Sequence, residues 1–291
     1  MTLEEAVARA TGRRVVSLAR VGGGDINDAY AAALEDGARA FVKTRADAPA
    51  GEFPAEAAAL RWLAEPGGLG VPEVLGILDA DSAPRLLALE FLEADHPGDD
   101  ADFGHGLATI HAAGAEAFGG STSLRIGPLT LPNDPTAAWP EFYADRRLRP
   151  LLAPARDRGA LSSSGVTAVE RVCDRMADLA GPAEPPARLH GDLWSGNVLW
   201  SSGRPYLIDP LAYGGHREVD LAMLRLFGSP GPRFLAAYES DAPLAAGHED
   251  RVPLYQLFPL LVHAVLFGGS YGASAERAAR RYSGGERQRR H

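Results

Sequence analysis

The pattern of apolar and polar positions in the first ninety residues is mainly that of short strands. The spacing of Thr2 and Glu5 matches a capping box, which predicts a helix that runs to about Ala10. Apolar and β-branched residues then predict strands over 14–19, up to about Leu34, over 39–44, over 73–78 and over 85–91. Because a Glu-Asp-Gly turn joins two of these strands as a hairpin, we expect an antiparallel sheet.

Within the strand region, a helix that begins near Pro54 is predicted between the third and fourth strands. The pattern changes after the fifth strand. The stretch 93–100 is polar, and we place a hinge between two lobes at about 90–95. Residues 1–92 are expected to form the first lobe and residues 93–291 the second.

Helical spacing of apolar residues dominates the second lobe. It predicts helices around Leu107 and Ile110, over about 138–152, around Cys173 and from Asp220 onward. The segment 254–263 is largely apolar, so we expect it to be buried. The predicted fold class is α+β, with a small antiparallel-sheet lobe followed by a larger, mainly helical lobe.

Composition places the chain among ordinary globular proteins. It has 291 residues, of which 46% are hydrophobic and 23% charged. No apolar run approaches the roughly 20 residues that span a bilayer, and the acidic N-terminus is unlike a signal peptide, so we expect a cytoplasmic protein without a membrane partner. A net charge of −9 argues against nucleic acid as a partner. We expect a monomer or a weak dimer.

Two residue types are rare enough to be informative. A single cysteine, Cys173, excludes an internal disulfide and a cysteine-built metal site, and its helical setting favours a small core residue. Of the 29 basic residues other than histidine, 28 are arginine, and the only lysine is Lys43. A lysine kept against this bias suggests a task for a compact ammonium group.

The most informative stretch is Leu-His-Gly-Asp-Leu-Trp-Ser-Gly-Asn-Val-Leu at 189–199. Asp192 and Asn197 are five residues apart, and Asp209 ends an apolar run twelve residues further on. Phosphoryl transfer needs one carboxylate to accept the proton of the attacking hydroxyl, with an amide and a second carboxylate to hold magnesium. The alternative is two surface loops whose carboxylates cap turns. The His-Gly pair before Asp192 and the apolar residues before Asp209 favour the catalytic interpretation.

A glycine triplet lies one hairpin upstream of Lys43. Gly22, Gly23 and Gly24 separate two predicted strands, and such residues let the backbone approach a phosphate closely. A glycine triplet alone is more often a turn. Its position before the only lysine makes it a candidate nucleotide lid.

The Asp-Asn spacing of the 189–199 stretch is that of the protein-kinase catalytic loop, in which a metal-binding Asp also follows on the next strand. Here Gly191 replaces the Arg of that loop. The sequence of this stretch resembles that of kinases in the aminoglycoside-kinase-like branch of the fold. Within that branch it is most similar to the fructosamine kinase family. Similar pieces extend over most of the chain, at 22–27, 41–43, 126–129, 132–133, 220–223, 254–257 and 266–271.

The resemblance implies an ATP site in the first lobe. An acidic residue on the helix after the third strand would pair with Lys43 and hold it at the α- and β-phosphates. Glu56 is the first candidate and Glu52 the second, with a solvated helix residue as the alternative. Backbone groups at Glu90, Phe91 and Leu92 would bind the adenine edge.

The resemblance also implies a reaction, the ATP-dependent phosphorylation of the sugar 3-hydroxyl of ketoamines, small or protein-bound. The product releases its amine, which amounts to deglycation. Asp192 would be the base, Asn197 and Asp209 the magnesium ligands, and Lys43 the phosphate-binding cation. Asp220 would accept hydrogen bonds from the catalytic-loop backbone, with a helix cap as the alternative.

Two further residues are implied to face the acceptor. Trp194 would stack on the sugar or its amine substituent, with packing under the loop as the alternative. His263 would lie near the substrate pocket, with a hydrogen-bonded core histidine as the alternative. Some relatives carry a cysteine in the glycine-rich loop, where a disulfide switch is proposed. This chain has Asp25 there, so the switch does not transfer.

Two other functions compete. One is a kinase for another hydroxylated amine, such as an aminoglycoside, choline or homoserine. The other is a non-catalytic kinase-like binding module, which would be expected to have lost some of the four catalytic positions. A protein kinase is disfavoured, because only ten residues separate Asp209 from Asp220, too few for an ordinary activation segment.

Overall fold

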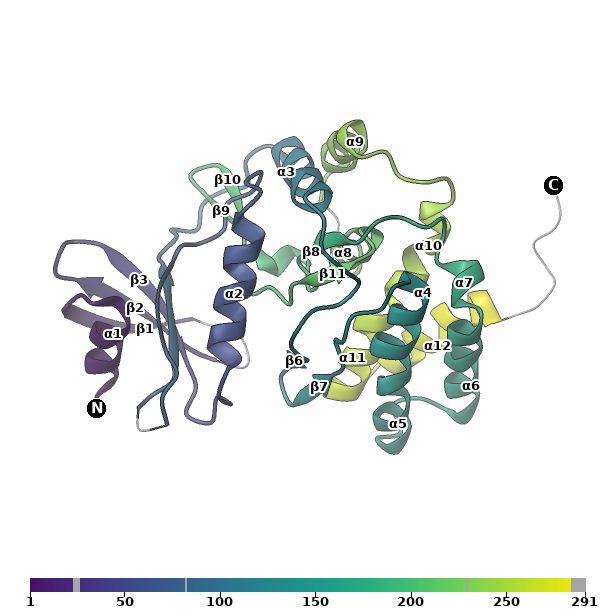
Figure 1. The fold of residues 1–291 in the computed structure, drawn as a ribbon, viewed down its shortest axis with the longest axis horizontal. Coiled ribbons are helices and arrows are strands. Elements are labelled where there is room, and N and C mark those ends of the chain that lie inside the picture. Colours follow the sequence, from purple (N-terminus) through teal and green to yellow (C-terminus); the bar gives the residue numbers. More distant parts are fainter. Residues whose placement is uncertain (23–26, 82, 229, 284–291) are drawn as a thin grey trace.

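The sheet of the first lobe has five antiparallel strands in the order β1-β2-β3-β5-β4 (Figure 1). The computed structural model describes residues 1–22, 27–81, 83–228 and 230–283. The strands are β1 (Val15–Val21), β2 (Asp28–Leu34), β3 (Arg39–Thr44), β4 (Val74–Leu78) and β5 (Leu86–Glu90). All five predicted strands are therefore present, and β3 has the predicted bounds.

One helix covers each face of this sheet. Helix α1 (Leu3–Thr11) begins with the predicted capping box, and α2 (Glu52–Ala64) contains Pro54 in its first turn. Successive side chains of a strand point to opposite faces. Val42 accordingly packs in the cluster that contains α1, whereas Leu87 packs in the cluster that contains α2. The same alternation turns Lys43, next to Val42, toward α2.

The second lobe is mainly helical, as predicted (Figure 1). Its α-helices are α3 (Asp100–Ala112), α4 (Trp139–Phe142), α5 (Arg149–Asp157), α6 (Ser163–Asp174), α7 (Met176–Leu179), α8 (Glu218–Leu224), α9 (Pro232–Asp241), α10 (His248–Tyr255), α11 (Leu257–Phe267) and α12 (Tyr271–Ser283). A π-helical segment, Tyr143–Leu148, joins α4 to α5, so the helix predicted over 138–152 runs on to Asp157. Pro150 lies at the start of α5 and has no N–H to continue the α-helical ladder.

Three two-stranded antiparallel sheets also lie in the described part of the second lobe. The pairs are β8 (Ala187–Leu189) with β11 (Tyr213–Gly215), β9 (Val198–Ser201) with β10 (Arg204–Leu207), and β6 (Leu124–Ile126) with β7 (Leu129–Leu131). The segment 254–263 is largely buried in the main helical core, as expected. Among the described residues, no helix has the length and apolar character needed to traverse a bilayer.

A backbone bridge fixes the β9–β10 hairpin against the segment that follows α2. The N–H of Gly70 donates to Pro205 O (3.0 Å), and the N–H of Leu207 donates to Gly70 O (2.8 Å). A Cβ on Gly70 would lie 2.5 Å from the Tyr206 ring, so only glycine allows this approach. The predicted lobe boundary at about 90–95 stays a prediction; β5 ends at Glu90 and α3 begins at Asp100.

Cys173 lies in α6 and belongs to the core, as predicted. Burial raises the pKa of its thiol to about 12. The nucleophilic thiolate is therefore scarce at neutral pH. Asp25 stands where some relatives carry the cysteine of the proposed disulfide switch, and it lies outside the described residues.

We expect activity to be the same under reducing and mildly oxidising conditions. Assays after incubation with dithiothreitol or with a mild peroxide would check this, with Cys173→Ser as the control variant. A reversible loss of activity that the oxidant causes in the parent protein but not in Cys173→Ser would contradict the prediction and make Cys173 a regulatory site.

Candidate active site

A buried carboxylate in the first turn of α8, that of Asp220, holds the loop that carries Asp192 in place. Asp220 is fully buried and accepts hydrogen bonds from the N–H groups of His190 (2.7 Å) and Gly191 (3.0 Å). Its side chain thus stabilises the catalytic loop, and no side chain caps α8. Asp220 therefore has the geometry expected from the resemblance. His111 of α3, whose part the sequence did not indicate, also donates to Asp220 through Nε2 (3.2 Å).

The backbone explains why the loop has glycine where protein kinases have arginine. Gly191 has a φ of 83°, in the left-handed region. A Cβ at this position would lie 2.2 Å from the carbonyl oxygen of Leu211. Any side chain here would push apart the two segments that carry Asp192 and Asp209.

His190 joins those two segments directly. Its Nε2–H donates to the carbonyl of Ile208 (2.9 Å), while its Nδ1 accepts the N–H of Asp192 (3.3 Å). Burial lowers the pKa of His190, which favours the neutral ring that this pattern requires. His190 therefore sets the distance between the segment that carries Asp192 and the segment that carries Asp209. The sequence marked the His-Gly pair but gave the histidine no role.

The side chains of Asp192 and Asn197 contact each other. Asn197 Nδ2 donates to the backbone O (2.8 Å) and to Oδ2 (3.1 Å) of Asp192. Its Oδ1 receives no hydrogen bond from the described part of the chain, so this oxygen is available to bind a metal ion. Burial raises the pKa of Asp192 to about 6, despite the Asn197 hydrogen bond that opposes this shift. The carboxylate is therefore largely ionised at neutral pH, yet binds a proton more tightly than an ordinary aspartate, as a general base requires.

Asp209 and Lys43 come from different lobes and touch. Asp209 has a φ of 55°, unusual for a residue other than glycine, and its carboxylate forms a hydrogen bond with Lys43 Nζ. Lys43 Nζ also donates to Glu56 Oε1 (2.7 Å), whereas Glu52 pairs with Arg45 (2.8 Å). The structure thus places Glu56, and not Glu52, beside the lysine.

The two carboxylates control the charge of Lys43. Burial by itself lowers the pKa of this amine, but Glu56 and Asp209 outweigh it, so that the pKa of Lys43 is raised. The ammonium group therefore remains charged although only 7% of the residue is exposed. A buried, fixed positive charge between the lobes is suited to the phosphates of a nucleotide.

The roles of the lid and the hinge residues in nucleotide binding stay predictions. Gly22 follows β1, while Gly23 and Gly24 lie outside the described residues. At the hinge, the N–H of Glu90 donates to Glu73 O (2.8 Å) and that of Phe91 to Arg39 O (3.3 Å). These two amides are used within the sheet. Of the three residues expected at the adenine edge, Leu92 is the one whose backbone N–H donates to no backbone carbonyl in the described part of the chain.

Trp194 and His263 lie in one aromatic cluster, which we define as Trp194, Phe227, His263, Phe267 and Tyr271. Ring centroids are 6.1 Å apart for Trp194 and Phe227, 5.0 Å for Phe227 and His263, and 4.9 Å for His263 and Tyr271. His263 Nδ1–H donates to Pro259 O (2.7 Å), and Nε2 has no hydrogen-bond partner in the described part of the chain. Trp194 is 37% exposed and Phe267 63%, so the cluster reaches solvent beside the catalytic loop.

Sequence reasoning missed the members that make this cluster continuous. Phe227 follows α8 and connects Trp194 to His263, but nothing in its local sequence marks it. Tyr271 begins α12 and lies in the Leu-Phe-Gly-Gly-Ser-Tyr stretch at 266–271. That stretch resembles the family, but its sequence does not indicate that Tyr271 contacts His263.

The environment of Lys43 yields a labelling prediction. An amine-reactive ATP analogue should label Lys43 in preference to the only other amine, the N-terminus, and excess magnesium-ATP should protect it. Lys43→Arg keeps the charge but brings a wider, planar head into a site between two carboxylates. We expect kcat to fall further than nucleotide affinity. The arginine would still attract the phosphates, but it would displace them from their alignment with the acceptor hydroxyl, on which the rate depends.

Mass spectrometry of the labelled peptide and steady-state kinetics would test this. Labelling that ATP does not prevent, or a kinetically silent Lys43→Arg, would remove Lys43 from the site.

Comparison with known proteins shows which family the chain resembles. The fructosamine kinase family model matches residues 2–283. A protein from Synechocystis assigned as a ketoamine kinase is 36% identical, over 94% of each chain. The chloroplastic protein-ribulosamine 3-kinase of Arabidopsis thaliana is 32% identical, over 90% of this chain and 81% of its own.

Solved structures add the fold. A Thermobifida fusca protein assigned as a fructosamine-3-kinase superposes with a TM-score of 0.90 at 47% identity, covering 96% of this chain and 97% of its own. An aminoglycoside phosphotransferase bound to AMP-PNP and hygromycin B superposes with a TM-score of 0.64 at 17% identity, covering 98% of this chain and all of its own, which shows a shared two-lobed fold. The chain belongs to the fructosamine kinase family.

Proposed function

We propose that this protein is an ATP-dependent kinase that phosphorylates the sugar 3-hydroxyl of ketoamines and thereby starts the release of the glycated amine. The observation that carries this is a set of two side-chain pairs in a member of the fructosamine kinase family. Asp192 pairs with Asn197, Asp209 pairs with Lys43 of the other lobe, and the hydrogen bond from His190 to Ile208 joins the two segments that carry the pairs. In this proposal Asp192 is the base and Lys43 the cation that phosphoryl transfer requires.

Each residue has a part in the reaction. Asp192 accepts the proton of the acceptor hydroxyl, and its raised pKa strengthens that acceptance. Lys43, held by Glu56, binds the α- and β-phosphates. His190 and Asp220 keep the base and Asp209 at a fixed separation. Together they align the hydroxyl with the phosphorus atom.

The donor set fits magnesium carried on ATP. Asn197 Oδ1 and the partly exposed Asp209 carboxylate are oxygen ligands, which magnesium prefers. The described residues contain no group of three His, Cys, Asp or Glu side chains arranged to hold a metal by themselves. That agrees with an ion that completes its shell with phosphate and water. Bound magnesium would neutralise charge on the transferring phosphoryl group.

The aromatic cluster fits the amine side of the acceptor. A ketoamine carries a basic nitrogen beside its sugar, and an ammonium group is attracted to aromatic faces. Trp194 follows the base by two residues, so a sugar hydroxyl at Asp192 would leave the amine substituent near Trp194 and Phe227. His263 Nε2 is available to the sugar hydroxyls.

An acceptor screen tests the proposal. Coupled assays of ADP release with ribulosamine, fructosamine, choline, homoserine and an aminoglycoside should show turnover chiefly with the two ketoamines. Phosphorus and proton NMR of the product should place the phosphate on carbon 3. Preferred turnover of an aminoglycoside, choline or homoserine would contradict ketoamine specificity while keeping the kinase chemistry. No turnover with any acceptor would favour a non-catalytic binding module.

Phe227 tests the role of the cluster. Phe227→Leu keeps the apolar volume but removes the aromatic face, and we expect KM for the ketoamine to rise about two- to fivefold, the value of an exposed cation–π contact. Both kcat and KM for ATP should stay unchanged, and Phe227→Tyr, which restores the ring, should behave like the parent protein. If KM for the ketoamine is the same in Phe227→Leu, the cluster does not contact the substrate.

Cytoplasmic location, a monomeric or weakly dimeric state and acceptance of protein-bound ketoamines stay predictions. Size-exclusion chromatography with light scattering, and assays on a glycated protein, would address the last two.

A further inference from the structure

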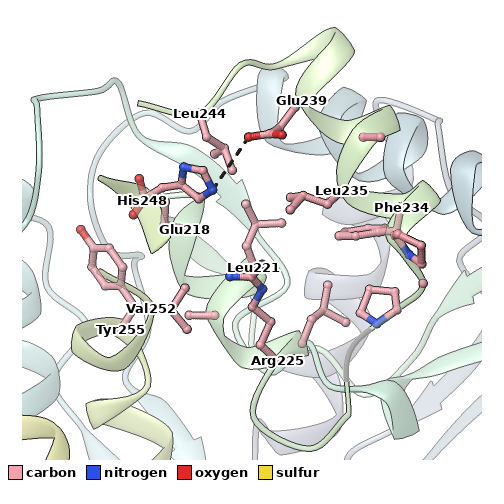
Figure 2. Close-up of a pocket in the computed structure, with 16 residues that line it drawn as sticks. Glu218, Leu221, Arg225, Phe234, Leu235, Glu239, Leu244, His248, Val252 and Tyr255 are labelled. Carbon is pink, nitrogen blue, oxygen red and sulfur yellow. Dashed lines mark ion pairs between the residues drawn. The ribbon is translucent and has the colours of Figure 1, made fainter. Parts of the chain in front are cut away.

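A cavity of about 410 Å³ lies between α8, α9 and α10 (Figure 2). None of the residues that line it belongs to the 189–199 loop, to β3 or to the aromatic cluster. Its volume is within the range of about 300–1,000 Å³ typical of small-molecule sites. Its apolar walls are formed by Leu221, Leu224, Phe234, Leu235, Leu244 and Val252.

The cavity has an apolar end and a polar end. Leu221, Leu224 and Phe234 are buried. The side chains of Glu239 and His248 are 38% and 21% exposed, and Figure 2 shows them pointing toward each other. A ligand would therefore place hydrocarbon against the leucines and a polar head beside Glu239 and His248.

Most other polar groups of the lining are already paired within the protein. Glu218 accepts two hydrogen bonds from Arg251, at 2.8 and 2.6 Å. Arg225 donates two to Glu249, at 2.6 and 2.9 Å. The hydroxyl of Tyr255 donates to a backbone carbonyl. These groups have little capacity left for a ligand.

Glu239 is different. The nearest basic side-chain nitrogen is His248 Nε2 at 3.9 Å, beyond hydrogen-bond distance, and in the described part of the chain no donor is bonded to this carboxylate. His248 Nε2 also lies 3.2 Å from Glu249, whose carboxylate is already paired with Arg225, so Glu239 is the carboxylate of the lining that has no bonded donor in the described part of the chain. The electrostatic preference is for a cation with N–H donors.

We propose that this cavity binds an apolar primary amine, with its hydrocarbon part between α8 and α9 and its ammonium group on Glu239. The net charge of −9 favours the approach of cations. This site is separate from the acceptor site of the proposed function, and its existence does not depend on that function.

Binding of 2-phenylethylamine to the whole chain, compared with that of 2-phenylethanol, tests the proposal. The alcohol has nearly the same shape and no charge. NMR spectra of methyl-labelled protein should show shifts at Leu221, Leu235 and Val252, with a dissociation constant about tenfold lower for the amine than for the alcohol. Glu239→Gln should abolish this preference. Glu170→Gln, at an exposed position of α6 outside the cavity, should preserve it.

Three results would overturn the proposal: equal affinity for amine and alcohol, the same amine preference in Glu239→Gln, or shifts confined to methyl groups outside the cavity. The last result, with shifts near the 189–199 loop, would show that the amine binds at the acceptor site. The parent protein's kinase activity does not enter the measurement, so a failure here leaves the proposed function untouched.

Discussion

Asp192→Asn is expected to lower kcat by about 10²–10⁴-fold, the usual contribution of a general base. The amide has nearly the shape of the carboxylate but cannot take the proton of the acceptor hydroxyl. KM for ATP should change little, because Lys43 and Glu56 are untouched. Steady-state kinetics with a ketoamine acceptor would measure both quantities.

The fold should survive this change. The new side chain keeps an oxygen that can accept the Asn197 Nδ2 hydrogen bond, and the neighbouring backbone contact with His190 is unaffected. Thermal unfolding would confirm an intact protein. Asp178→Asn, at an exposed position of α7, is the matched control and should be silent. Normal turnover by Asp192→Asn would refute the assignment of the base.

Loss of the Asp209 carboxylate should have the second largest effect. In Asp209→Ala the only predicted metal ligand left is the uncharged amide of Asn197, which cannot offset a divalent cation. We expect the magnesium concentration for half-maximal activity to rise at least about tenfold, since even outer partners of metal ligands have effects of that size. Titrating activity against magnesium at fixed ATP would measure it.

The backbone at Asp209 requires a second variant. Its φ of 55° is tolerated by asparagine better than by alanine, so Asp209→Asn removes the charge without adding strain. Both variants should shift the magnesium dependence if charge is the cause. If only Asp209→Ala does so, the conformation of the segment is responsible, and if neither does, Asp209 is not a metal ligand.

The sequence by itself determined the elements whose signals are local. The capping box at Thr2 and Glu5, the strand over 39–44 and the Asp192–Asn197 spacing each depend on residues a few positions apart, and the structure has all three. The bias against lysine singled out Lys43 before any geometry was known. Such features are predictable because neighbours in the chain are already neighbours in space.

Tertiary structure decided which of those residues meet. The choice of Glu56 over Glu52 depended on the turn between β3 and α2, whose geometry the sequence did not specify. The hydrogen bond from His190 to Ile208 joins residues 18 positions apart. The aromatic contact of Phe227 with Trp194 joins residues more than thirty positions apart. The cavity beside Glu239 likewise exists only where three helices pack imperfectly. Contacts of this kind arise from the packing of whole elements, and no local pattern encodes how those elements pack.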